Sequence, residues 1–111
     1  MKFEHEVYGK IAVVNLEGTV NEENLRPLRL LLEQELGGET RDFVLDLTAV
    51  EFMDSAALEM MLWLQEQADE QLGQVRLVGP SENVAEVLRI TRLAKQFDAH
   101  EELEGALKSL K

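Results

Sequence analysis

Cysteine is absent from the 111-residue sequence, which excludes disulfide bonds, thiol catalysis and thiolate metal sites. Basic residues are also few: 11 lysines and arginines stand against 22 acidic residues, for a formal net charge of −11. A molecule of this charge repels polyanions and gains no counterion-release energy from nucleic acid. Nucleic acid and anionic membrane surfaces are therefore poor candidate partners.

Long apolar runs are missing too. No stretch approaches the roughly 18 residues that a membrane-spanning helix requires, so we expect no direct membrane insertion. The first eight residues carry charges where a secretory signal peptide has an apolar segment. We therefore expect a cytoplasmic protein.

Histidine occurs only as His5 and His100, each beside a glutamate and without the spacing that metal ligands use. We interpret both as surface residues. The sequence offers no Ser-His-Asp set and no phosphate-binding glycine loop. We therefore predict no metal site, no cofactor and no enzymatic activity.

The composition is typical of a globular domain, because 45% of the residues are hydrophobic and 30% are charged. The length suits one hydrophobic core, so we expect a single domain over residues 1–111. Strand-like and helix-like segments follow one another in the order β-β-α-β-α-β-α-β-α. This order predicts an α/β fold: a mixed sheet with an N-terminal antiparallel hairpin, parallel pairs and about four helices.

Apolar spacing locates these elements. The expected strands lie at residues 3–8, 11–16, 43–47 and 74–78, with a short edge strand around Phe97. The expected helices run from 25 to 36 with Asn21 as N-cap, from 56 to 72, from Ser81 onward, and from 103 to 110. The strand at 43–47 is almost continuously apolar, as in a central strand covered on both faces, and the helix after it is the most apolar.

The junction between these two elements is the most informative part of the chain. We expect the strand to end near Leu47 and a short loop to carry Phe52 and Met53 inward, which places Asp54 and Ser55 where the helix begins. A serine at this position is most simply an N-cap. It can also accept a phosphoryl group, whose negative charge suits the positive end of the helix dipole.

Residues 46–58, with the sequence DLTAVEFMDSAAL, resemble the signature of STAS domains (sulphate transporter and anti-sigma factor antagonist), in which a strand and D-L-x-x-V-x-F-[IM]-D-S-[SA]-G-L precede a helix. The resemblance extends over essentially the whole chain through the order of elements. It implies an anti-sigma factor antagonist. In such proteins the matching serine, here Ser55, is phosphorylated by an anti-sigma factor that is also a kinase, and a phosphatase restores it. The unphosphorylated form binds the anti-sigma factor.

The partner surface expected from this resemblance lies at the end of the sheet where the strand-to-helix loops meet. Its predicted members are Asp54, Ser55, Leu58, Glu59, Leu62, Val20 and Asn21.

Two positions differ from the family pattern. Ala57 replaces the usual glycine, where an extra methyl would obstruct a close partner, and Asn21 replaces an aspartate. Both favour the alternative function, a constitutive STAS scaffold in a stress-signalling assembly or a lipid-transport ATPase complex, without phosphorylation switching.

Overall fold

The computed structural model describes residues 1–110, which form a five-stranded sheet, four α-helices and one short 3₁₀ helix. The elements are β1 (Lys2–Tyr8), β2 (Ile11–Val20), α1 (Leu25–Leu36), β3 (Asp42–Met53), α2 (Ser55–Glu70), β4 (Val75–Val78), α3 (Glu82–Ile90), the 3₁₀ helix η1 (Ala94–Gln96), β5 (Asp98–His100) and α4 (Leu103–Ser109). The predicted order of strands and α-helices is confirmed, and η1 is the one element that the sequence did not indicate.

The strands lie in the order β1-β2-β3-β4-β5, so β1 and β5 are the two edges. β1 pairs antiparallel with β2, and every later pair is parallel. The hairpin turns through Gly9 and Lys10, and Gly9 has a φ of +62°, a value that favours glycine at the first position of a two-residue turn. The mixed sheet predicted from the sequence is confirmed.

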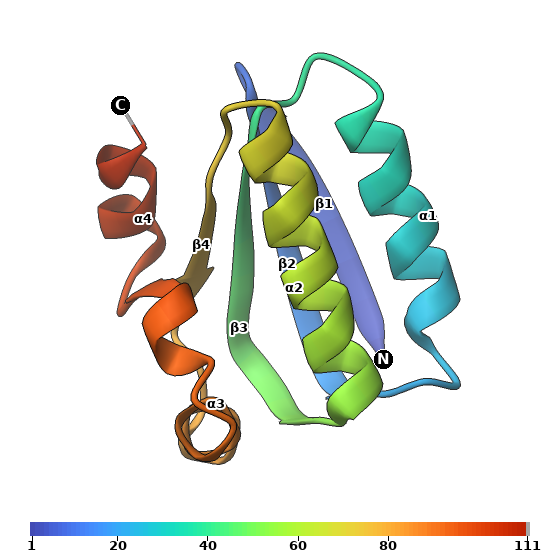
Figure 1. The fold of residues 1–111 in the computed structure, drawn as a ribbon, viewed down its shortest axis with the longest axis vertical. Coiled ribbons are helices and arrows are strands. Elements are labelled where there is room, and N and C mark those ends of the chain that lie inside the picture. Colours follow the sequence, from blue (N-terminus) through green and yellow to red (C-terminus); the bar gives the residue numbers. More distant parts are fainter. Residues whose placement is uncertain (111) are drawn as a thin grey trace.

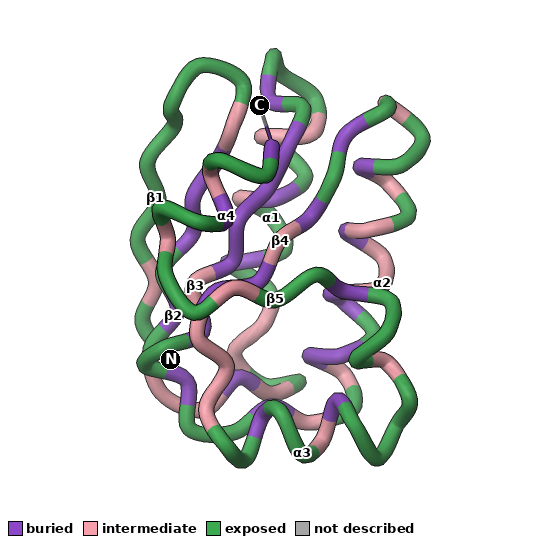
Figure 2. Tube along the Cα trace, turned by 90° about the vertical axis from the view of Figure 1, so that its left-hand side faces the viewer, coloured by how far each residue is buried: buried purple, intermediate pink, exposed green. Residues whose placement is uncertain are grey.

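Alternate residues of the central strands enter two separate hydrophobic clusters, because successive side chains of a strand point to opposite faces. Phe43 and Leu45 join the larger cluster with α1, α2 and α3, whereas Val44 joins the smaller one under α4. Figure 1 shows α1 and α2 running side by side in the same direction over one face, with α4 apart from them. Figure 2 shows that β1 is largely exposed at its edge. The side of the sheet covered by α1 and α2 therefore carries most of the core.

β3 is longer than the sequence predicted. The expected strand stopped near Leu47, but β3 continues to Met53 and pairs there with Val20. The apolar run breaks because Thr48 and Ala49 are exposed, while pairing with β2 resumes after register shifts. Met53 is buried as expected, whereas Phe52 points outward with 46% of its surface exposed, so its predicted inward position is wrong.

α2 supplies more buried residues than any other helix in the part of the chain described. It ends at Glu70, before the predicted stripe reaches Leu72. Leu72 instead has a φ of +64° and is 87% exposed, because the chain turns there so that Gly73 can donate a hydrogen bond to the Ala68 carbonyl. Within residues 1–110, no helix combines the length and apolar character needed to cross a bilayer.

Candidate functional site

Asp54, and not Ser55, is the N-cap of α2. Its Oδ1 accepts a hydrogen bond of 2.9 Å from the backbone N–H of Ala57, and its own backbone is extended. Ser55 is therefore the first helical residue, and the prediction that it caps the helix is wrong. The physical reason is that a carboxylate one residue earlier satisfies the free N–H groups of the first turn.

The Asp54 carboxylate also ties the helix to a second loop. Its Oδ2 accepts a hydrogen bond of 3.0 Å from the backbone N–H of Glu22, and the Asp54 N–H donates to the Val20 carbonyl at 3.2 Å. One side chain thus joins the end of β2 to the start of α2. The predicted neighbourhood of the β2–α1 loop and Ser55 follows from these bonds.

Asn21 does not cap α1, which begins only at Leu25. Its Oδ1 accepts from the N–H of Asn24 at 3.2 Å, while the Asn21 N–H donates to Asn24 Oδ1 at 2.9 Å. Asn24 also donates from Nδ2 to the Thr19 carbonyl at 2.8 Å. These reciprocal bonds have the pattern of a capping box, and they close the turn of residues 22–24 that leads into α1.

Some of the remaining residues predicted for the partner surface are accessible to solvent, and others are buried. Ser55 and Glu59 are exposed, and Leu62 is partly exposed. Val20, at 0% exposure, and Leu58, at 6%, belong to the core, so their predicted place on the partner surface is wrong.

The two core residues were misplaced for different reasons. Val20 faces inward as the last residue of β2, and Leu58 lies on the sheet side of α2.

Phe52 is an exposed residue near Ser55 that was not predicted to belong to the site. An aromatic side chain two residues before the capping aspartate was its only signal in the sequence.

Ala57 is fully buried, with 0% exposure, although it lies only two residues after Ser55. Its methyl group packs in the core under the helix. The extra methyl therefore cannot obstruct a partner that approaches Ser55, contrary to the expectation from the sequence.

The histidines have unequal surroundings. His5 lies at the surface and pairs with Glu35 at 3.4 Å, as expected of a surface residue. His100 is only partly exposed, and its Nε2 is buried without a hydrogen-bond partner among residues 1–110, so its predicted surface position is wrong. Within residues 1–110, no group of acidic and histidine side chains is arranged to hold a metal ion.

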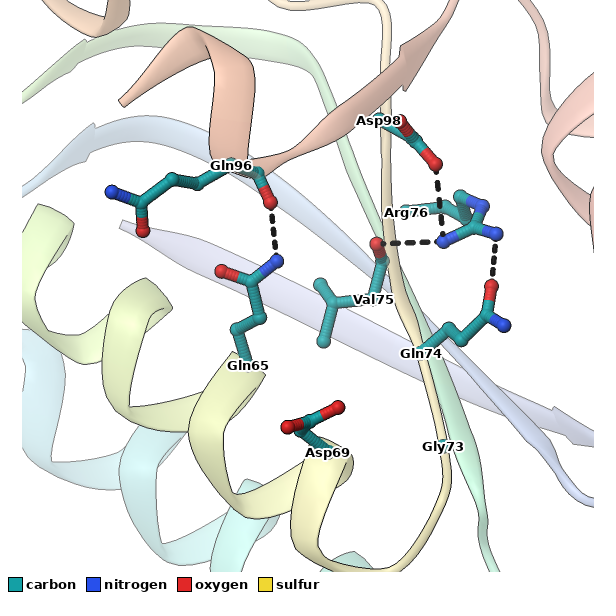
Figure 3. A pocket seen from close by; sticks show the side chains of 8 residues that line it. All are labelled: Gln65, Asp69, Gly73, Gln74, Val75, Arg76, Gln96 and Asp98. Carbon is teal, nitrogen blue, oxygen red and sulfur yellow. Dashed lines mark hydrogen bonds and ion pairs between the residues drawn. The ribbon is translucent and has the colours of Figure 1, made fainter. Parts of the chain in front are cut away.

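A polar pocket of about 140 Å³ lies between α2, β4 and η1. Figure 3 shows the side chains that line it. Arg76 lies 3.5 Å from Asp98 across it, and Gln65 donates to the Gln96 carbonyl. No serine, threonine or histidine lines the pocket. Because its polar groups largely bind one another and no hydroxyl or imidazole lines it, the Ser55 region remains the candidate site.

Several solved structures share this fold. A proposed anti-sigma factor antagonist from Thermotoga maritima has a TM-score of 0.90 at 23% identity, over 97% of this chain and 93% of that one. An anti-sigma factor antagonist from Mycobacterium paratuberculosis has a TM-score of 0.87 at 22% identity, over 98% and 92%. The Bacillus cell fate determinant SpoIIAA, in its phosphorylated form, has a TM-score of 0.80 at 19% identity, over 99% and 100%.

No curated protein sequence matches the chain significantly. The family model described as the STAS domain matches residues 2–106, which is nearly the whole of the chain. The matched residues contain all five strands, the first three α-helices and Ser55. The chain therefore belongs to the STAS domain family.

Proposed function

We propose that this chain is an anti-sigma factor antagonist, a cytoplasmic protein-binding module and not an enzyme. In its unphosphorylated state it binds an anti-sigma factor that is also a serine kinase. Phosphorylation of Ser55 releases the partner, and a phosphatase acting on the phosphoserine restores binding. SpoIIAA, an antagonist of the same fold whose structure is known both with and without phosphorylation, supports the comparison.

The observation that carries the proposal is the free hydroxyl of Ser55. The sequence has three serines. Ser81 Oγ accepts from the Val84 N–H as the cap of α3, and Ser109 Oγ contacts Arg76 and the Ala106 carbonyl. Ser55 is exposed, and its hydroxyl makes no hydrogen bond within residues 1–110, because Asp54 already caps the helix. Its hydroxyl can therefore be modified without breaking a structural bond.

A phosphoryl group on Ser55 would change the surface far more than the fold. It would add about −1.5 to −2 charges at a helix N-terminus, where the backbone dipole tolerates negative charge. The same group would stand among the carboxylates of Asp54 and Glu59 on the face offered to the partner. Desolvating this charge at an interface without a cationic partner is costly, so phosphorylation should weaken binding while the domain stays folded.

The proposed partner surface keeps the accessible members of the predicted set: Asp54, Ser55, Glu59, Leu62 and Asn21. Phe52, with 46% of its surface exposed just before Asp54, is added to it. Exposed aromatic side chains are frequent energetic anchors of protein interfaces.

A constitutive scaffold without switching is the second candidate. The observation that favours it is Asn21, a neutral residue whose side chain is engaged with Asn24 where relatives of the switching type carry an aspartate. The two candidates use the same surface and differ only in whether Ser55 is modified.

The test uses every anti-sigma factor kinase encoded in the source genome, each purified and incubated with the chain and ATP. One kinase should transfer phosphate to the wild type but not to Ser55→Ala. It should also transfer phosphate to Ser109→Ala, which is the matched control for the loss of a serine. Titration of that kinase should give similar affinities for wild type and Ser55→Ala, and an affinity at least about tenfold lower for Ser55→Asp. Equal affinities for wild type and Ser55→Asp, with no phosphate transferred, would favour the scaffold.

A further inference from the structure

A groove of about 300 Å³ runs between α1 and α2 and extends the Ser55 surface sideways. Figure 1 shows that both helices begin at the same end of the molecule. The groove lies at that end, because its lining residues belong to the first halves of the two helices. The residues that line it are Leu25, Arg26, Arg29, Ala56, Glu59 and Met60. Because Ala56 directly follows Ser55, a partner that covers Ser55 also reaches this groove.

The two arginines on the α1 side present cationic groups to the groove. The Arg29 guanidinium stacks 4.2 Å from the centroid of the Trp63 ring, and its Nε lies 3.5 Å from a carboxylate oxygen of Glu33. These contacts fix the orientation of the guanidinium, while 48% of the side chain remains exposed. Arg26, one turn earlier, is exposed and forms no ion pair in the described part of the chain.

This pair of cations stands out against the charge of the molecule, which has a net charge of −11. The opposite wall carries the Glu59 carboxylate, and the floor includes Met60, a residue only 3% exposed. The groove thus has a cationic wall on α1, an apolar floor and an anionic wall on α2. The opposite charges of the two walls favour one orientation of a bound segment, in which its acidic side chain faces α1.

We propose that this groove binds an acidic segment of the anti-sigma factor, an inference that rests on the proposed function. A carboxylate of that segment pairs with Arg26 and Arg29, whose planar guanidinium groups match a carboxylate with two parallel hydrogen bonds. An apolar side chain beside the carboxylate lies on Leu25 and Met60. On the α2 side, the Glu59 carboxylate is complementary to a basic group of the partner, so the charges of both walls select the partner and its orientation.

Ser55 and the two arginines act on the same partner in different ways, and the groove binds the acidic segment without phosphorylation. Ser55 decides whether the partner stays bound, and the two arginines decide which partner binds. A kinase whose matching segment is basic would meet two arginines and should be rejected.

The test is a titration of the anti-sigma factor kinase that binds the wild-type chain, against Arg26→Glu and a matched control, Lys10→Glu. Lys10 is exposed in the β1–β2 turn, forms no ion pair within residues 1–110, and its replacement changes the net charge equally. Arg26→Glu should weaken binding at least about tenfold, because a reversed charge then faces the acidic segment. Lys10→Glu should stay within about twofold of the wild type, as a charge outside the interface should.

Nuclear magnetic resonance adds a readout that is independent of the substitution. On addition of the kinase, the Arg26 and Arg29 signals should shift together with those of Ser55. If the kinase binds and shifts Ser55 but leaves the arginine signals and the Arg26→Glu affinity unchanged, the groove proposal is wrong and the proposed function stands. If no kinase binds the wild type, both are wrong.

Discussion

Replacing Asp54 separates two roles that a single carboxylate combines. Asp54→Ala removes the acceptor for the Ala57 N–H, which caps α2, and the acceptor for the Glu22 N–H, which holds the β2–α1 loop. Asp54→Asn keeps a side-chain oxygen for the cap but replaces the second acceptor by an amide NH₂ group, which cannot accept from Glu22. Ser55→Ala removes a hydroxyl that makes no hydrogen bond within residues 1–110.

The magnitudes follow from these contacts. Loss of an N-cap costs about 1 kcal/mol, and loss of one further hydrogen bond in a partly exposed site costs roughly 1 kcal/mol. We therefore expect Asp54→Ala to lower the free energy of unfolding by about 2 kcal/mol, equivalent to a fall in Tm of roughly 9 °C for a domain of this size. Asp54→Asn should lose about half as much, and Ser55→Ala should stay within about 0.5 kcal/mol of the wild type.

Urea unfolding followed by circular dichroism, with equal slopes in all four proteins, measures these differences. A loss of more than about 1 kcal/mol in Ser55→Ala, together with a neutral Asp54→Ala, would contradict the capping geometry and return the cap to Ser55. Equal losses in Asp54→Asn and Asp54→Ala would show that the cap contributes little and the tether to Glu22 contributes nearly everything.

Two further predictions concern other parts of the molecule. Glu59→Lys should weaken binding to the cognate kinase severalfold in a titration, because Glu59 lies on the proposed surface, whereas Glu104→Lys on α4 should not, and a larger effect of Glu104→Lys would move the surface to α4. Gly73→Ala should unfold the domain or lower its Tm steeply in a thermal melt, because a Cβ there would lie 1.8 Å from the Arg41 carbonyl oxygen, and a wild-type Tm would contradict this close approach.

Much of the fold follows from patterns that the sequence displays directly. The leucine spacing of residues 25–36 and the apolar run at 43–47 predicted α1 and the core of β3, because each reflects burial against one or both faces of the sheet. The end of β3 was not predictable in this way. Beyond Leu47 the strand is held by backbone pairing with β2, and backbone pairing leaves no trace in hydropathy.

The sequence predicted where the site lies, but not the role of each of its residues. The sequence put Asp54 and Ser55 at the start of α2, yet both residue types are good N-caps, so only the hydrogen bond to Ala57 assigns the cap to Asp54. Leu58 was assigned to the surface from its place near the start of α2, where nearly every residue is apolar, so the hydropathy pattern does not reveal which side faces the sheet. The groove beside Ser55 depends on the packing of α1 against α2, which no local pattern reports.

The measurement that tests the central claim most directly compares one protein in two states. The chain is prepared with phosphoserine at position 55 and without it, and each form is titrated with the anti-sigma factor kinase by calorimetry, with thermal melts run in parallel. We predict nearly equal melting temperatures and an affinity at least about 100-fold lower for the phosphorylated form, because the added charge of about −2 must be desolvated at the interface. Equal affinities of two equally folded forms would contradict the account and leave Ser55 without a switching role.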